Sequence, residues 1–266
     1  MAVVAFALVI ALAAAVRSTW SPCGWSMLSQ ITPVAEAGRQ QRFARTAAWF
    51  ILGSVLGGLT LGVAIALGAA AVSVAGLGSH AALVLVVAFA VVSAAVDARV
   101  LGFAPPFLRR QVNEDWLSNY RSWVYGGGFG WQIGAGVTTY VMTEAVPLMI
   151  VLGVISARPW AGLLIGGVFG LVRGLAVLLG APIRTFPALL EFHRGFERWA
   201  EPVRQIVIGV QVAVAAIAAW IVAPALVAAA ITGGAVLFFA RSLAHATTPR
   251  PVEPQASHAG RVVKPG

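Results

Sequence analysis

Long apolar runs without charged residues dominate this chain and restrict it to a membrane fold. Residues 205–240, for example, hold no charged side chain. One lipid-spanning helix needs roughly 20 apolar residues, and several runs reach that length. Charged residues make up 10% of the 266, against about 25% in soluble domains. Because the runs are continuous rather than alternating, they predict an all-α polytopic membrane protein and not a β-barrel.

Seven membrane spans are predicted, two of them irregular. Pro22 interrupts the first span, and the glycine run at 126–130 makes the beginning of the fourth irregular. Pro224 would separate the last two spans; the alternative is one long final helix, which gives six spans. The expected helices are 3–32, 46–76, 81–103, 122–155, 159–181, 204–222 and 224–243.

The basic residues indicate the orientation in the membrane. The chain has 18 Lys and Arg against 9 Asp and Glu, and most basic residues follow the first, third and fifth spans or lie in the tail. Cytoplasmic loops carry such an excess. Seven spans therefore predict an N-terminus outside and a C-terminus in the cytoplasm, and the net charge is assigned to topology rather than to nucleic acid. The N-terminal run has no basic residues before its apolar core, which favours a retained helix over a signal peptide.

Two segments outside the spans have their own character. Residues 184–204 mix leucine and aromatic side chains with charges, which predicts a helix lying in the membrane interface. Residues 246–266 contain few apolar side chains, and we expect a disordered cytoplasmic tail.

Short sequence matches indicate an internal repeat. "LGSVLG" at 52–57 resembles "IGGVFG" at 165–170, "LGA" occurs at 67–69 and 179–181, and Trp20 corresponds to Trp131, each pair about 112 residues apart. Three helices per unit is an odd number, so the second copy would be inserted upside down, as in many transporters. The expected organisation is one three-helix unit at 1–105, a second at 106–222, an extra helix at 223–245 and the tail at 246–266.

The first span carries "SPCG" at 21–24, followed by a basic loop and the glycine-rich "WFILGSVLGG". With the three-plus-three repeat, this resembles the CcdA/DsbD transmembrane thiol–disulfide family of cytochrome c biogenesis. The resemblance implies a cysteine in helix one and another in helix four that pass electrons across the membrane. Cys23 matches the first, whereas Trp131–Gly134 stands where the second should be. The two-cysteine shuttle therefore cannot be carried over whole.

Cys23 is the candidate catalytic residue. A helix that restarts after Pro22 would direct its positive N-terminal end at the thiol, and Arg17 precedes Cys23 by six residues. The alternative is that Cys23 is a small buried packing residue. Pro22, Gly24 and Pro147 are expected to have structural roles at helix breaks.

Polar residues inside apolar spans are the candidate binding residues. Arg173 is the strongest anomaly, since an arginine in a membrane helix normally faces the bundle interior and has a partner. Glu144 or Asp97 could pair with it, or it could bind an anion. Gln211 is expected to make a hydrogen bond between helices. The candidate substrate-binding residues are Arg17, Ser21, Gln132, Thr138, Thr139, Glu144 and Arg173.

Three functions remain open, and one of them is a non-catalytic assembly factor. The resemblance implies a membrane protein that handles redox equivalents through Cys23 with a thioredoxin-like partner, and any enzymatic activity would be at most a thiol–disulfide relay. The alternative is a small-solute or ion transporter or exporter on the same fold. The four histidines are scattered, so we predict no metal site and no cofactor. The expected partners are the lipid bilayer and, if the resemblance holds, the thioredoxin-like protein; no nucleic acid is expected, and the sequence does not indicate the oligomeric state.

Overall fold

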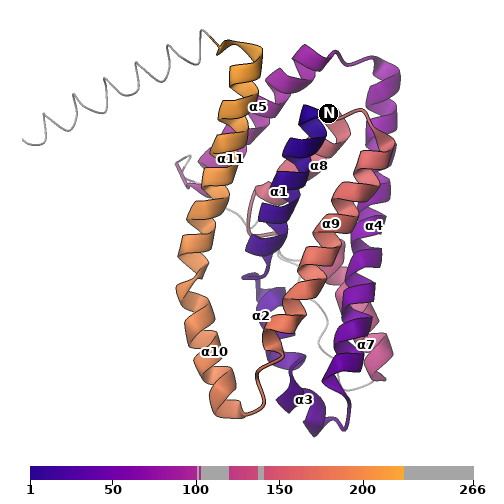
Figure 1. The fold of residues 1–266 in the computed structure, drawn as a ribbon, viewed down its shortest axis with the longest axis vertical. Helices are drawn as coiled ribbons and strands as arrows, with labels where there is room; N and C mark the ends of the chain where they lie inside the picture. The colour runs from indigo at the N-terminus through magenta and orange to yellow at the C-terminus, as the bar shows by residue number, and fades with distance from the viewer. Residues whose placement is uncertain (101, 103–119, 137–140, 225–266) are drawn as a thin grey trace, which may run out of the picture. The chain divides into compact units, whose positions relative to one another are not determined.

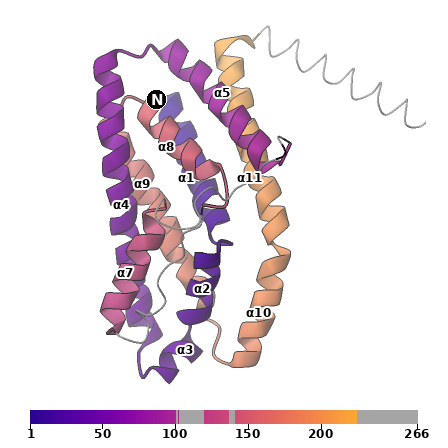
Figure 2. The same cartoon turned by 180° about the vertical axis from the view of Figure 1, so that it is seen from behind.

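The computed structural model describes residues 1–100, 102, 120–136 and 141–224, and every regular element within these ranges is helical. Figures 1 and 2 show the helices from opposite sides. In chain order they are α1 (Ala2–Ser18), α2 (Pro22–Gln30), α3 (Pro33–Gly38), α4 (Phe43–Ala75), α5 (Ser79–Asp97), α7 (Ser122–Gly134), α8 (Ala145–Ile155), α9 (Pro159–Leu175), the 3₁₀ helix η1 (Ala176–Gly180), α10 (Phe186–Arg198) and α11 (Ala200–Val222).

Several of these helices are suited to cross a membrane. Within the described residues, four segments are long and apolar enough: α4, α5, α9 with η1, and α10 with α11. The bent pair α1 and α2 makes a fifth if it is counted as one span. Large apolar side chains remain exposed on these helices, among them Leu67 and Val74 on α4, as expected for surfaces in lipid. The prediction of a polytopic helical membrane protein is confirmed at this level.

The first predicted span is broken where its sequence indicated. α1 and α2 meet at an angle of 62°. The Ser21 hydroxyl accepts a hydrogen bond from the main-chain N–H of Gly24 at 3.2 Å, and Pro22 fills the first helical position. Serine before a helix and proline in its first turn are favoured because they satisfy or remove donors that have no partner inside the helix.

The fourth predicted span is also interrupted, but not at the glycine run. Residues 126–130 lie in the regular part of α7, and the helix ends at Gly134, before α8 begins at Ala145. The expectation of an irregular beginning was wrong, because these glycines allow close packing instead. A Cβ atom on Gly130 would stand 2.1 Å from the Phe50 carbonyl oxygen of α4.

α4 forms the centre of the bundle. It packs against α7 and α9, and both views show it beside them (Figures 1 and 2). The Ser54 hydroxyl donates to the Gly170 carbonyl of α9 at 2.7 Å. A Cβ on Gly166 would lie 2.2 Å from the Gly58 carbonyl. As in other membrane helix pairs, small residues let the backbones approach.

The remaining helices depart from prediction mainly at their ends. α5 stops at Asp97, six residues before the predicted end, whereas α4 agrees with its prediction to within three residues. α10 is a helix, as predicted, but it runs on into α11 (Figure 1) rather than lying across the bundle. The end of α11 lies at the same end of the bundle as the N-terminus (Figure 1). The predicted helix at 224–243 and the tail lie almost wholly outside the described residues.

Candidate functional site

Arg173 joins the ends of two broken spans. It lies on α9, with only 3% of its surface exposed. Its Nη1 donates to the Ile133 carbonyl at 2.7 Å, and its Nη2 lies 3.5 Å from the Ser18 carbonyl. These carbonyls belong to the last turns of α7 and α1, where helices carry partial negative charge. Each also accepts a main-chain N–H, from Gly136 at Ile133 and from Ser21 at Ser18. The guanidinium therefore neutralises two helix C-termini at one point.

This placement corrects the expected partners of Arg173. Its hydrogen bonds in the described structure are to main-chain carbonyls, and it forms no ion pair with Glu144 or Asp97 there. The reason is geometric, because the ends of α1 and α7 present their carbonyls to α9 directly. Arg173 also lies over the Phe169 ring, 5.6 Å from its centroid, a distance at which a cation and an aromatic face attract.

Cys23 lies beside this junction, in the first turn of α2, and is completely buried. It is close enough to Arg173 for an electrostatic interaction. It belongs to an apolar cluster that also contains Phe50, Phe129 and Ile133. Reactive thiols typically occur near a cation or a helix N-terminus, and Cys23 has both. The sequence indicated the helix N-terminus, but it indicated Arg17 rather than Arg173 as the cation.

The segment around the break is fixed to α10. The Trp20 indole donates from Nε1 to the Phe196 carbonyl at 2.8 Å. The two rings also stack with centroids 4.3 Å apart. Farther along α2, the Ser29 hydroxyl lies 3.2 Å from Nε2 of His193. These contacts hold α2 and therefore the position of Cys23 relative to α10.

A second polar cluster forms where α5 ends. Asp97 is 6% exposed, and its Oδ1 accepts from the Glu144 main-chain N–H at 2.9 Å. Its Oδ2 accepts from the Thr143 hydroxyl at 2.6 Å and from the Gln211 amide at 2.8 Å. The prediction that Gln211 bonds between helices is confirmed. Asp97 thus ties α5 to α11 and to the beginning of α8.

The other predicted binding residues are distributed between these two clusters. Arg17 lines a cavity with Asp97. Glu144 is half-buried at the N-cap of α8, and Pro147 lies in the first turn of that helix, where its missing N–H costs nothing. Gln132 is partly exposed on α7, next to Ile133. Ser21 caps α2. Thr138 and Thr139 lie outside the described residues.

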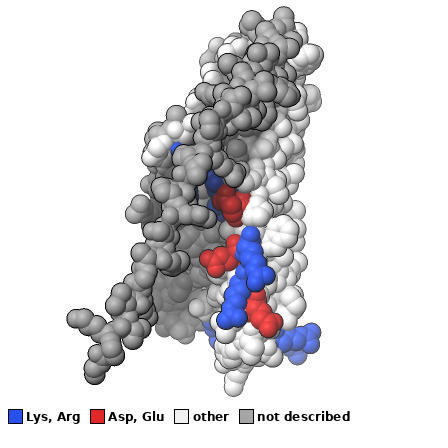
Figure 3. All heavy atoms as spheres, turned by 90° about the vertical axis from the view of Figure 1, so that its left-hand side faces the viewer, with Lys and Arg blue, Asp and Glu red and all other residues white. Residues whose placement is uncertain are grey.

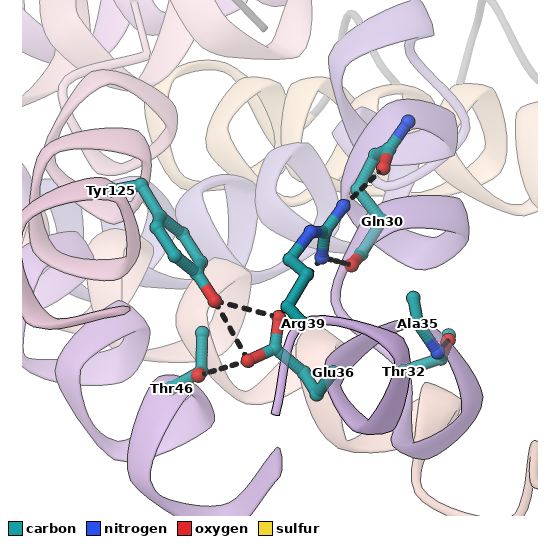
Figure 4. Close-up of polar contacts among 7 residues, drawn as sticks. All are labelled: Gln30, Thr32, Ala35, Glu36, Arg39, Thr46 and Tyr125. Carbon is teal, nitrogen blue, oxygen red and sulfur yellow. Dashed lines mark hydrogen bonds and ion pairs between the residues drawn. The ribbon is translucent and has the colours of Figure 1, made fainter. Parts of the chain in front are cut away.

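A third cluster, centred on Glu36, was not predicted. Glu36 is fully buried on α3. It accepts hydrogen bonds from the Tyr125 hydroxyl at 2.7 and 2.8 Å and from the Thr46 hydroxyl at 2.5 Å (Figure 4). Arg39 pairs with it at 3.1 Å and also donates to Gln30. In the sequence, the only indication of this cluster is an acidic residue, Glu36, close to the loop arginines Arg39, Arg42 and Arg45. Because every group has a partner, we interpret the cluster as structural.

Metal-binding groups do not gather in the part of the chain that the structure describes. No three His, Cys, Asp or Glu side chains there could hold one ion. The chemistry available at the broken-helix junction is therefore that of one thiol beside one guanidinium, and at the Asp97 cluster that of arginines and carboxylates.

Comparison with known proteins gives three informative relatives, each named "Methylamine utilization protein MauF". The Paracoccus denitrificans protein is 34% identical over 180 residues, 64% of this chain and 62% of the relative. The Paracoccus versutus protein is 33% identical over 202 residues, 73% of each chain. The Methylobacillus flagellatus protein is 30% identical over 207 residues, 73% of this chain and 69% of the relative. The match thus spans less than two thirds of the Paracoccus denitrificans protein. No family model and no solved structure matches the chain.

Proposed function

The chain belongs to the MauF family of methylamine utilization proteins, and we propose that it supports methylamine utilization from within the membrane through thiol chemistry at Cys23. The names of the relatives indicate the process, methylamine utilization. The helices that are long and apolar enough to cross a membrane indicate the location. Thiol chemistry is the finer part of the proposal. The observation that carries it is the position of Cys23 at the junction of two broken spans, beside Arg173.

The arrangement around Cys23 suits a nucleophilic thiol. The thiolate is the attacking form, and a guanidinium and a helix N-terminus are the groups that accompany such thiols in proteins. Broken helices inside membranes occur where protein or water satisfies the freed backbone groups. Here Arg173 adds a charged donor to carbonyls of both α1 and α7, which also accept main-chain N–H groups. The same guanidinium thus stabilises the break and lies close enough to the thiol to act on it electrostatically.

A single cysteine limits the reaction to exchange. The Cys23 thiolate would attack a disulfide of a thioredoxin-like partner, forming one mixed S–S bond while the partner's original S–S bond breaks. The released partner thiolate takes up a proton. When that thiol, or another on the partner, attacks the mixed disulfide, Cys23 is regenerated as thiolate. The cycle rearranges a disulfide without net oxidation, so no external oxidant is consumed.

The resemblance to the CcdA/DsbD family supports the proposed fold. Ile133 belongs to the stretch where that family has its second cysteine, and it shares the apolar cluster of Cys23. The two positions therefore belong to one cluster, although only one carries sulfur. We propose that this chain keeps the family's inverted architecture and uses exchange with a partner in place of an internal cysteine pair.

Helix pairing supports the inverted repeat. α4 packs against α9, and α5 packs against α11. In the proposed units, at 1–105 and 106–222, these are the second and third members of each half. The N-terminus lies at the same end of the bundle as the end of α11 (Figure 1), as expected after an even number of crossings. We propose that this end faces outside, with a final span returning the C-terminus to the cytoplasm.

A second candidate function is the transport of a small solute or ion. One observation favours it: the buried Arg17 lines a cavity, and two of its nitrogens lack a hydrogen-bond partner among the described residues. A transporter needs such a polar site inside the bundle. The proposed thiol function does not use this cavity.

Mixed-disulfide trapping tests the thiol proposal. Cells carrying a tagged chain are quenched with acid and N-ethylmaleimide during growth on methylamine, and the chain is then examined without reductant. We expect an additional band that disappears on reduction and in Cys23→Ser. Absence of such a band in a growing strain would contradict the exchange cycle. Arg173→Ala cannot separate the two functions, because Arg173 also supports the fold.

A further inference from the structure

A cavity of about 50 Å³ lies at the end of α5, apart from the Cys23 junction. Arginines dominate its charged lining. Figure 3 shows basic and acidic side chains gathered along the α10–α11 side of the molecule, on a surface that is otherwise uncharged where it is described. The lining residues are Arg17, Asp97, Arg99, Met142, Thr143, Arg204 and Val207.

Arg17 is the central observation. It is 7% exposed, and its Nε and Nη1 atoms are buried with no hydrogen-bond partner in the described structure. A buried charged donor without an acceptor is costly, more so than a neutral one. Its position in the last turn of α1 offsets part of that cost. Among the described residues, none supplies an acceptor for these two donors.

The carboxylates nearby do not supply such an acceptor. Both oxygens of Asp97 are occupied by neutral donors from Thr143, Glu144 and Gln211. Among the residues placed by the structure, neither Arg17 nor Arg99 forms an ion pair. Glu144 has one buried oxygen without a partner, but it does not line the cavity.

Arg204 completes the basic wall. Its Nε and Nη2 bind the exposed Glu201, and its Nη1 donates to the Asp97 carbonyl at 2.7 Å. Its donors are therefore engaged, and it contributes charge rather than free hydrogen bonds. Arg99 is exposed at the end of α5, where its guanidinium can reach a ligand at the mouth of the cavity.

We propose that this cavity binds a small oxyanion, held by the guanidinium of Arg17 and by the charges of Arg99 and Arg204. Guanidinium groups are the preferred protein partners of carboxylate, phosphate and sulfate oxygens. The volume admits one such group or a few water molecules. The oxyanion could be a free solute or the phosphate of a lipid headgroup, because the chemistry is shared. The site goes beyond the proposed thiol function and does not depend on Cys23.

Thermal unfolding of the full chain in a neutral detergent tests the site. Sodium sulfate, phosphate and acetate are titrated against sodium chloride of equal ionic strength, and phosphatidylglycerol is added in a separate arm. We expect saturable stabilisation by an oxyanion, with an apparent Kd raised at least about tenfold in Arg17→Gln. Arg158→Gln, which changes an exposed arginine between α8 and α9, should behave as wild type. Cys23→Ser should also retain the effect, which separates this site from the thiol proposal.

The outcomes divide clearly. Stabilisation by free anions that is weakened in Arg17→Gln identifies a solute site, and stabilisation only by phosphatidylglycerol that is weakened in the same variant identifies a headgroup site. If Arg17→Gln does not fold, the same titrations are made with Arg99→Gln, in which the exposed arginine of the cavity is replaced. Weakened stabilisation in that variant supports the site in the same way. The proposal would be overturned if no ligand gave saturable stabilisation, or if the Arg17, Arg99 and Arg158 variants were stabilised equally. Water molecules would then be the groups that bind Arg17.

Discussion

Arg173 donates a hydrogen bond to the Ile133 carbonyl at 2.7 Å, and this contact joins α9 to the C-terminal end of α7. The same guanidinium reaches toward the Ser18 carbonyl at the end of α1. A charge that is costly in a membrane helix thus lies where two helix ends supply negative partial charge. The breaks in α1–α2 and α7–α8 and the buried arginine support one another.

The first prediction concerns Arg173 itself. Arg173→Ala should lower the free energy of unfolding by at least about 2 kcal/mol, because two helix C-termini lose a charged donor and a buried side chain is truncated. Arg173→Lys should recover only part of it, since one ammonium cannot reproduce the planar, forked guanidinium. Unfolding by SDS in mixed micelles measures both, with Arg158→Ala as the exposed control. An Arg173→Ala protein as stable as wild type would show that the main-chain donors of Gly136 and Ser21 satisfy these carbonyls without the guanidinium.

The second prediction concerns the turn before α2. A Cβ atom on Gly24 would stand 2.0 Å from the Thr19 carbonyl oxygen, so Gly24→Ala must push the two segments apart. We expect a loss of about 1–3 kcal/mol, typical of overpacking. Gly38→Ala is the matched control, because nothing lies within 4 Å of a Cβ there. Equal stability of the two variants would mean that the chain does not approach itself so closely at the break.

The third prediction concerns the pairing of α4 with α9. Gly166 and Gly167 are neighbours on α9, but only Gly166 faces the Gly58 carbonyl, with a virtual Cβ 2.2 Å away. At Gly167 the nearest atom is a flexible Leu59 methyl group at 3.5 Å. Gly166→Ala should therefore lower the melting temperature and the membrane yield, whereas Gly167→Ala should not. The reverse order would contradict the assigned helix face.

The fourth prediction concerns the Glu36 cluster. Tyr125→Phe and Glu36→Gln should each destabilise the protein, because Glu36 is fully buried and accepts from Tyr125 and Thr46. The double variant should cost less than the two single effects added together, since the residues act on one contact. Glu191→Gln, on the exposed side of α10, is the control. Additive losses would indicate that the two residues stabilise the fold independently.

Much of the membrane fold could be predicted from apolar runs and a few capping residues. Pro22 after Ser21 located the break in the first span because that pair begins a helix. The glycine run at 126–130 led to the wrong prediction of an irregular helix, because glycine in a membrane helix can either break the helix or allow close contact with another helix. Only the neighbouring helix decides between them, and the sequence does not show that Phe50 lies opposite Gly130.

The candidate site was predictable by residue type but not by partner. Cys23, Arg17 and Arg173 stood out as unusual residues in apolar spans, and the structure places all three in the bundle interior. Their partners could not be foreseen, since Arg173 bonds to main-chain carbonyls, which every residue has. The Glu36 cluster was missed for a related reason. A carboxylate in a basic loop normally faces solvent, and its burial depends on Tyr125, 89 residues away in the chain.

Growth on methylamine with Cys23→Ser tests the central proposal most directly. The variant is expressed in a host from which the chain's own gene has been deleted, and its amount in the membrane is matched to wild type. Serine fits the buried position, so the fold should persist while the nucleophile is lost. The account predicts wild-type protein levels and no growth on methylamine as sole carbon source. Growth at the wild-type rate would contradict thiol chemistry at Cys23 and leave transport as the better account.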